Sequence, residues 1–265
     1  MAKKELSIII VSYNTKKELR VCLESIYKYV DVNFEIIVID NASSDSSVEM
    51  IKNNFKDVIL ICNDKNLGFA KAVNQGFGKA KGDYYLLLNP DTEVKNGAVE
   101  TLLDFTKTQS DFGVAGGKLI NPDGTIQPSC YNLPTLRRAI SEFWFGKKET
   151  FEKYFPETLK PVEVEAVVGA VMLIPKESIE KVGLFDERYF LYFEDLDWCR
   201  RAKNLGLKIW YHPQVKFFHQ HGASGKKIPE KTNRWLIESS KKYHGIFKYY
   251  CITTIIKIGQ LLFRT

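Results

Sequence analysis

Short apolar runs alternate with amphipathic stretches along the first ninety residues. Thr15 and Glu18 match a capping box at the start of a helix, and further helices are expected through Phe55 and Gly76. Runs typical of strands buried on both faces of a sheet lie at 6–11, 34–39, 58–62 and 84–88. This alternation predicts right-handed crossovers and a mostly parallel, twisted sheet in an α/β fold.

The pattern changes in the second half of the chain. Gly113–Gly117 and the turn Asn121–Gly124 predict a sheet edge followed by a hairpin. Val164–Ile174 is predicted as one long strand, in which Gly169 and Ala170 allow a ligand to approach the backbone. The other predicted elements are helices near 97–108, over 175–182 and from 194 to about 206, and short strands at 209–212 and 215–218.

Polar clusters follow three of the predicted strands. They are Ser12-Tyr13-Asn14, Asp40-Asn41 and the pair Asn89 and Asp91. The carboxyl ends of parallel strands share one edge of the sheet, where α/β proteins bind ligands. A carboxylate there can hold a hard cation, and the cation can hold a diphosphate. No GxGxxG follows the first strand and no GxxxxGK[ST] occurs, which disfavours dehydrogenases and P-loop proteins and leaves another kind of nucleotide pocket.

An acidic cluster lies in the first turn of the helix that starts near residue 194. The helix dipole stabilises Glu194, Asp195 and Asp197 and should lower their pKa values, so that one of them is ionised and able to accept a proton. Asp197 lies beside Arg200 and Arg201, where ion pairs along the helix offer a structural role. Asp195 lies on the less polar face, which should turn toward the protein and its cleft.

Charge and cysteine content narrow the class of protein. The net charge is +6, and much of the positive charge lies after Lys226, which argues against a uniformly basic nucleic-acid binder. The five cysteines form no CxxC pair and are predicted to be reduced thiols. Met1–Glu5 leads directly into the first strand, so no signal peptide is expected. No run reaches about 18 apolar residues, so no membrane span is expected.

Two further features carry candidate chemistry. His219 and His221 follow the last predicted strand beside Gly222, and they are equally compatible with a metal or phosphate contact and with ordinary structural roles. After Lys226, lysines mix with aromatic residues ahead of the apolar stretch Ile252–Phe263. That composition fits an amphipathic element on an anionic membrane, and also a helix packed on the domain.

Six motifs in order give the chain a family resemblance. They are SIIIVSYN, IIVIDNASSD, NLGFAKAVNQG, LLLNPDTEV, the stretch from VGAVMLIPKE to EDLDWCRRAKNLG, and FFHQHGAS. From Leu6 to Gly245 the sequence resembles inverting glycosyltransferases of family 2, which have the GT-A fold. NPD in place of the usual DxD resembles the bacterial rhamnosyltransferase branch, which uses dTDP-L-rhamnose. Asn89 here replaces the first acidic residue of that motif.

The resemblance implies a role for each candidate residue. Asp40 would contact a uracil or thymine ring, and Asn89 the ribose or sugar. Asp91 and His219 would bind Mg²⁺ or Mn²⁺ on the diphosphate, with His221 as the less favoured metal ligand. Asp195 would be the catalytic base, and Glu194 would assist by capping the helix or positioning the acceptor. The remaining donor-binding residues would be Val11, Ser12, Tyr13, Asn41 and Asn66.

The resemblance also implies an organisation and partners. Residues 1–225 would form the GT-A domain, with a nucleotide-sugar half at 1–115 and a smaller acceptor and catalytic half at 116–225. Independently of the resemblance, residues 130–160 mix aromatic and charged residues without a clear period, which fits a flap facing the acceptor. Residues 226–265 would be a basic, aromatic tail that associates with the membrane. The enzyme would transfer L-rhamnose to a lipid-linked saccharide in O-antigen, polysaccharide or cell-wall assembly, at the cytoplasmic face of the cell membrane.

Three other functions fit parts of this pattern. The donor could be UDP-galactofuranose, UDP-glucose or UDP-N-acetylglucosamine, which donor competition would separate. A nucleotidyltransferase would release pyrophosphate, and the acidic helix with FFHQHG argues against it. A non-catalytic sugar-nucleotide binder would have no need of a base, and both Asp91 and Asp195 are present.

Overall fold

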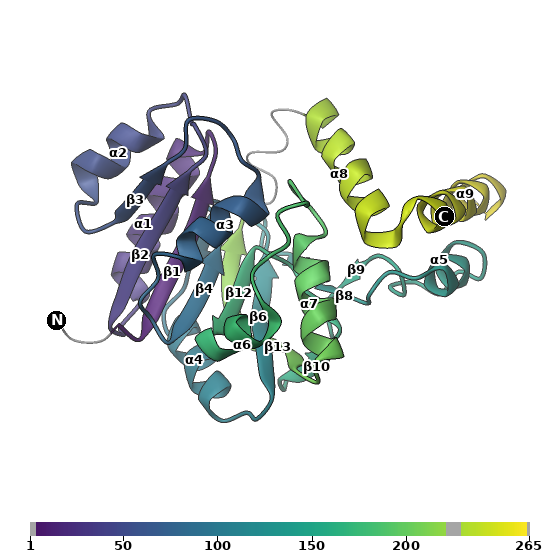
Figure 1. Ribbon diagram of the computed structural model, residues 1–265. Helices are drawn as coiled ribbons and strands as arrows, with labels where there is room; N and C mark the ends of the chain where they lie inside the picture. Colours follow the sequence, from purple (N-terminus) through teal and green to yellow (C-terminus); the bar gives the residue numbers. More distant parts are fainter. Residues whose placement is uncertain (1–3, 221–228, 264–265) are drawn as a thin grey trace.

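The computed structural model describes residues 4–220 and 229–263, and one mixed sheet runs through it (Figure 1). The sheet has ten strands, with the order β10-β13-β6-β12-β4-β1-β2-β3, while β5 pairs with β13 and β7 with β6. Its first four strands are parallel, as expected: β1 (Leu6–Ser12), β2 (Phe34–Asp40), β3 (Ile59–Cys62) and β4 (Tyr84–Leu88).

Two apolar cores cover the two faces of this sheet. Alternate residues of β1 separate between them: Ile8 and Ile10 lie in the core under α1, and Ile9 lies in the core under α3. This two-sided burial explains the uninterrupted apolar run, and each buried isoleucine contributes about 1.5–3 kcal/mol. The helices of this half are α1 (Lys16–Tyr29), α2 (Ser47–Asn54), α3 (Phe69–Phe77) and α4 (Ala98–Lys107).

The capping box predicted for α1 is absent. The Thr15 hydroxyl lies 3.0 Å from that of Ser12, and it makes no cap hydrogen bond. The first helical N–H, of Lys16, instead donates to Asp45 Oδ2 at 2.8 Å. A carboxylate from the β2–α2 loop thus caps α1, a long-range contact that local spacing does not reveal.

The prediction of a sheet edge at Gly113–Gly117 was wrong. These residues belong to β6 (Phe112–Ile120), which lies inside the sheet between β13 (Lys208–His219) and β12 (Val171–Pro175). A Cβ on Gly117 would lie 2.8 Å from the Val215 carbonyl oxygen, so glycine here permits close packing of strands. The predicted hairpin is present, because β6 pairs antiparallel with β7 (Ile126–Gln127).

Two predicted strand boundaries also differ from the structure. The long strand predicted at Val164–Ile174 is interrupted at Gly169 and Ala170, where the chain passes between two sheets. The two short strands predicted at 209–218 form one strand, β13, whose register shifts between His212 and Lys216 because Pro213 has no ladder donor. The other strands of the main sheet are β5 (Thr92–Val94) and β10 (Val162–Val164). A second sheet with the order β11-β8-β9 contains β8 (Cys130–Tyr131), β9 (Lys153–Tyr154) and β11 (Ala166–Val167).

Of the remaining helices, α6 and α7 lie beside the sheet, and α5, α8 and α9 lie at the right of Figure 1. They are α5 (Leu136–Phe143), α6 (Lys176–Val182), α7 (Glu194–Asn204), α8 (Pro229–His244) and α9 (Ile246–Phe263). Trp144 Nε1 donates to the Ile255 carbonyl at 3.0 Å, which joins α9 to α5. The C-terminal stretch is therefore packed on the domain. Within the described ranges, none of the helices has the length and hydropathy that a membrane span requires.

Candidate active site

The polar residues predicted at the strand ends lie along one edge of the sheet. Ser12 and Asp40 are in register on β1 and β2, and Asn41 N–H donates to the Ser12 carbonyl at 2.8 Å. On the other side of β1, Ile10 pairs with Leu88, so Asn89 follows β4 at the same edge. The shared edge confirms the expected clustering of these strand ends. Val11 and Tyr13 are half-buried beside them.

Asp40 has an unused carboxylate oxygen. The residue is buried, and its Oδ1 accepts a hydrogen bond from Ser43 N–H at 2.8 Å. In the described part of the chain no hydrogen-bond donor reaches its Oδ2. An acceptor held in this way suits an N–H group of a ligand, because a buried oxygen without a partner is otherwise costly.

Asn41 and Asn66 support the loop before α3. The Asn41 amide donates to the Gly68 carbonyl at 3.2 Å, and Asn66 Oδ1 accepts from Gly68 N–H at 2.9 Å. A Cβ on Gly68 would lie 2.6 Å from the Phe190 carbonyl oxygen, which in turn accepts from Phe69 N–H at 2.7 Å. These contacts tie the loop to the segment preceding α7. Both asparagines thus have a structural role in holding this loop.

Asp91 and His219 meet although 128 positions separate them in the sequence. His219 pairs with Thr92 in the β13–β5 ladder, and its Nε2 lies 3.3 Å from Asp91 Oδ1. Asn89 Nδ2 lies 3.4 Å from the same imidazole nitrogen. Gln127, which no sequence signal marked, places its amide oxygen 2.8 Å from His219 Nδ1. The structure therefore joins three predicted residues and adds a fourth.

Asp195 is held in a fixed position at the start of α7. Its Oδ2 accepts from Gly169 N–H at 2.9 Å, and its Oδ1 accepts from Leu196 N–H at 2.8 Å. Burial raises the pKa of the Asp195 carboxyl above its ordinary value, although the two N–H donors oppose that shift. The expectation that the helix dipole would lower this pKa was wrong, because desolvation is the larger effect.

Glu194 is buried beside Asp195 and less well satisfied. Burial, followed by the charge of Asp195, raises the pKa of Glu194 well above its ordinary value. Its Oε2 has no hydrogen-bond partner among the residues that the structure describes. Backbone donors thus favour a charge on Asp195, while the charge of Asp195 disfavours a second charge on Glu194.

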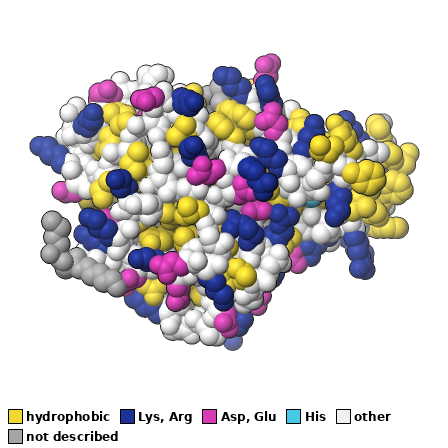
Figure 2. Space-filling view, in the orientation of Figure 1, with side chains coloured by type: hydrophobic (Ala, Val, Ile, Leu, Met, Phe, Trp, Pro, Cys, Tyr) yellow, Lys and Arg dark blue, Asp and Glu magenta, His cyan; other side chains and the backbone are white. Residues whose placement is uncertain are grey.

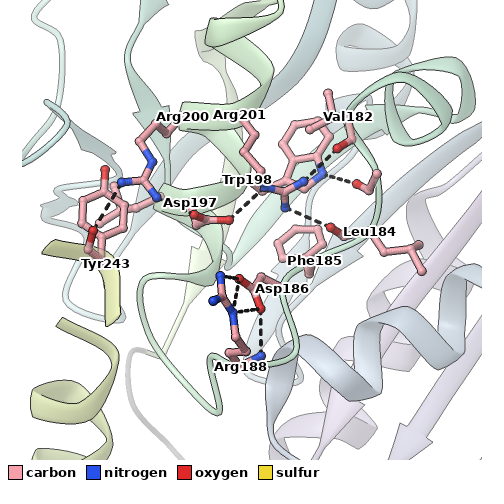
Figure 3. Close-up of polar contacts among 12 residues, drawn as sticks. Val182, Leu184, Phe185, Asp186, Arg188, Asp197, Trp198, Arg200, Arg201 and Tyr243 are labelled. Carbon is pink, nitrogen blue, oxygen red and sulfur yellow. Dashed lines mark hydrogen bonds and ion pairs between the residues drawn. The ribbon is translucent and has the colours of Figure 1, made fainter. Parts of the chain in front are cut away.

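Asp197 has the structural role that its spacing predicted (Figure 3). Arg200 NH2 lies 2.7 Å from Asp197 Oδ1, and Arg201 Nε lies 2.9 Å from Oδ2. Arg201 also donates to the Val182 and Leu184 carbonyls, at 2.8 Å and 2.9 Å. Asp197 and its arginines therefore fix α7 to the turn after α6.

The segment before α7 is strained and is supported by α8. Tyr192 and Phe193 both have left-handed backbone conformations, with φ of 69° and 68°. Such a conformation costs a residue other than glycine about 1–2 kcal/mol. Ser239 Oγ donates to the Leu191 carbonyl at 2.8 Å, and the Tyr243 ring lies 5.2 Å from that of Phe193. The C-terminal helices thus help to set the geometry of the acidic turn.

A cavity of about 440 Å³ opens beside the acidic turn. Four predicted residues line it: Asn89, Glu194, Asp195 and His219. The predicted flap at 130–160 contributes part of the wall, including residues of β8 and β9, and α8 and α9 contribute another part. The other predicted donor residues lie outside this cavity, along the sheet edge. His221 lies outside the described residues.

A buried carboxylate and residues of the polar sheet edge line the same cavity. Asp195, Asn89 and His219 all contribute to its wall, and His219 connects it to Asp91. A hydroxyl group bound in the cavity would lie between a carboxylate base and the group that it attacks. Because the cavity and the strand-end residues share Asn89 and His219 as a border, two substrates can be held side by side.

Comparisons with known proteins show what the chain is similar to. The N-acetylglucosaminyl-diphospho-decaprenol L-rhamnosyltransferase of Mycobacterium tuberculosis is 28% identical over 84% of this chain and 78% of its own length. Rhamnosyltransferase WbbL of Escherichia coli is 25% identical over 89% of this chain and 91% of its own length. The expected rhamnosyltransferase relationship is thus confirmed at the level of homologues.

A solved structure shows the same fold. The mannosyltransferase PcManGT from Pyrobaculum calidifontis, in complex with GDP-Man and Mn²⁺, aligns with a TM-score of 0.62 and 13% identity. The alignment covers 99% of this chain and 76% of that one. Residues 7–182, more than half of the chain, match the family profile described as Glycosyl transferase family 2. The chain belongs to glycosyl transferase family 2, and it is a glycosyltransferase with the GT-A fold.

Proposed function

We propose that this enzyme transfers L-rhamnose, with inversion, from dTDP-L-rhamnose to a lipid-linked saccharide. The observation that carries the proposal is Asp195, which two backbone N–H groups hold at the wall of a cavity bordered by Asn89 and His219. The rhamnosyltransferase relatives support the sugar, and the name of the mycobacterial relative supports an acceptor joined to a lipid by a diphosphate. Such an enzyme would act in cell-wall or O-antigen assembly.

Asp40 supports a thymidine or uridine diphosphate donor. Its unpartnered Oδ2 is an acceptor that suits the ring N–H shared by thymine and uracil. Cytosine and adenine present a lone pair at the corresponding ring nitrogen and would reach this oxygen only through their exocyclic amino groups. The main chain of Val11, Ser12 and Tyr13 runs beside Asp40 at the same sheet edge and would line the base.

Asp91 and His219 have the chemistry to hold a divalent cation. The Gln127 amide oxygen faces Nδ1, and Nε2 lies 3.3 Å from Asp91 Oδ1, so a proton on Nδ1 would leave the Nε2 lone pair available to a cation shared with Asp91. Gln127 then orients the imidazole as outer partners of metal-binding histidines do. Among the described residues, no three acidic, histidine or cysteine side chains are placed so that they could hold a metal ion together, so a bound Mg²⁺ or Mn²⁺ would take its other ligands from phosphate and water.

The reaction needs a base but no enzyme nucleophile. Asp195 would take the proton of the acceptor hydroxyl as the oxygen attacks the anomeric carbon of the donor sugar. A cation on Asp91 and His219 would stabilise the negative charge that develops on the leaving diphosphate. Attack from the face opposite the leaving group inverts the anomeric centre in one displacement. Glu194, protonated beside Asp195, would donate a hydrogen bond to the acceptor.

A donor screen tests this proposal. We expect dTDP-L-rhamnose with Mg²⁺ or Mn²⁺ to raise the midpoint of thermal unfolding more than UDP-glucose, UDP-N-acetylglucosamine or UDP-galactofuranose, because ligands that bind only the folded state stabilise it. Donor hydrolysis and transfer to a diphosphate-linked N-acetylglucosamine lipid would then be measured with each sugar. If a UDP-sugar gave the larger shift in the unfolding midpoint and the faster turnover, that UDP-sugar would be the donor and the rhamnosyl assignment would be wrong.

The end of the molecule formed by α5 and α9 supports attachment to a membrane. Phe145, Phe247, Leu261 and Leu262 are each at least 66% exposed, far more than large apolar side chains usually are. Figure 2 shows hydrophobic side chains gathered at the end where Figure 1 draws α9, with basic side chains beside them. We call this surface the apolar end.

Replacing residues of the apolar end should detach the enzyme from lipid. The double variant Phe247→Glu and Leu261→Glu should reduce co-sedimentation with phosphatidylglycerol vesicles several-fold. It removes apolar area that would be buried in the lipid. Its two negative charges also oppose the attraction of the basic side chains to anionic lipid, which is worth about 1 kcal/mol per basic residue. Higher salt should reduce pelleting of the wild type. Val21→Glu, at an equally apolar but distant position 42% exposed on α1, is the control. Equal pelleting of all variants would contradict the proposal.

A further inference from the structure

The cavity beside Asp195 changes in chemical character along its walls. Glu194 and Asp195 contribute carboxyl groups to the lining. Helices α8 and α9 contribute apolar side chains, those of Leu236, Ile237, Tyr249, Ile252 and Ile256. Lys153 on β9 is the only lysine or arginine among the lining residues within the described chain. Carboxylates, one ammonium group and an apolar wall therefore share one cavity.

Several contacts hold Lys153 in place. It is opposite Tyr131 in the β8–β9 ladder, and its ammonium lies 5.4 Å from the centre of the Tyr131 ring. The preceding turn is fixed by the buried Glu142, whose Oε2 accepts from the N–H groups of Thr150 and Phe151, both at 2.7 Å. The ammonium is thus presented to the cavity by an ordered strand.

The positive charge of Lys153 is incompletely compensated. In the described part of the chain no carboxylate lies within 4.0 Å of its ammonium, in contrast to Lys107 and Arg138, which make close ion pairs. Although the Lys153 side chain is exposed overall, desolvation by the surrounding protein lowers its pKa, and the charge of Asp195 opposes that shift. An anion in the cavity would supply the missing partner.

We propose that Lys153 binds the diphosphate that joins the acceptor sugar to its lipid. This inference rests on the proposed function and names the part of the acceptor that the cavity recognises. The sugar would then face Asp195, the diphosphate would lie at Lys153, and the first part of the lipid would lie on the apolar wall. The diphosphate of the donor is the other source of such an anion, but Asp40 and Asp91 lie along the sheet edge outside this cavity.

Calorimetry with simple probes tests the assignment without any sugar transfer. Farnesyl diphosphate and uncharged farnesol would represent the lipid side of the acceptor, and dTDP with Mg²⁺ would represent the donor. Lys153→Gln should weaken farnesyl diphosphate binding about 10- to 100-fold, the loss expected for one charge-assisted contact, and leave farnesol and dTDP affinities unchanged. Lys153→Arg should retain most of the affinity.

The matched control is Lys148→Gln, an exposed lysine on the same flap that does not line the cavity. With the lipid-linked acceptor, Lys153→Gln should raise KM and change kcat little. Farnesyl diphosphate that fails to bind the wild type, or binds Lys153→Gln equally well, would overturn the assignment even if the wild type transfers sugar. Loss of dTDP affinity in Lys153→Gln would place the lysine at the donor instead. Absence of sugar transfer by the wild type would refute the proposed function separately.

Discussion

Asp195→Asn is expected to lose about 10²–10⁴ in turnover, the usual cost of removing a general base. The substitution keeps the size of the side chain, and its amide oxygen can still accept from Gly169 N–H, so the fold should be retained. Donor affinity should be unchanged, because Asp195 faces the acceptor cavity and the proposed donor residues lie along the sheet edge. Turnover with saturating substrates and calorimetry with the donor would measure the two effects.

Two neighbouring carboxylates serve as controls for Asp195→Asn. Glu194→Gln removes a group that is expected to be protonated, so turnover should fall much less. Asp197→Asn breaks two ion pairs and should lower stability rather than the rate of the chemical step. If Asp195→Asn turned over normally while Glu194→Gln was inactive, the base would be Glu194.

The pH dependence of turnover gives an independent test of the same residue. Because burial raises the pKa of Asp195, the carboxyl binds its proton at a higher pH than an exposed aspartate does. Turnover should therefore decrease as the pH falls through this raised pKa. The acidic limb should disappear in Asp195→Asn, whose residual activity has no such group to protonate.

Asp91→Asn is expected to abolish metal-dependent donor binding and to reduce turnover by about 10³-fold or more, since it removes the proposed anionic metal ligand. Asp91 Oδ1 lies 3.3 Å from His219 Nε2. Calorimetry with dTDP, with Mg²⁺ and with EDTA, would separate the metal-dependent part of the affinity from the rest. For Asp91→Asn, the dTDP affinity measured with Mg²⁺ should equal the affinity measured with EDTA.

Glu93→Gln is the matched control. Glu93 lies two residues after Asp91, its side chain is 43% exposed, and it forms an ion pair with Lys95. It should bind donor and metal as the wild type does. A wild-type enzyme with the same dTDP affinity in Mg²⁺ and in EDTA would exclude the metal role of Asp91. Binding of Mn²⁺ alone, followed by electron paramagnetic resonance, would show whether Asp91 and His219 hold the ion before the donor arrives.

Local sequence patterns predicted the sheet and much of the candidate site. The apolar runs of β1, β2 and β4 are visible because both faces of each strand are buried, and Asp40 and Asp91 follow directly where these runs end. Asp197 was assigned to ion pairs from helical spacing, which is also a local property. The family resemblance supplied roles for Asp195 and His219 that spacing alone left open.

Contacts between distant segments account for what was missed. Gln127 meets His219 only because β7 pairs with β6 and β6 with β13, and Lys153 reaches the cavity only because β9 pairs with β8. Neither residue belongs to a motif. The cap of α1 by Asp45 and the interior position of β6 depend on long-range pairing in the same way.

By itself, then, the sequence determined the parallel half of the sheet, the strand-end position of Asp91 and the acidic first turn of α7, since hydrophobic periodicity and proline or glycine breaks act within a few residues. Only the tertiary structure decided the direction of the pKa shifts in that turn, because desolvation by packed neighbours outweighs the local helix dipole at Asp195 and Glu194. It likewise decided the composition of the cavity, whose walls come from chain segments that only folding brings together.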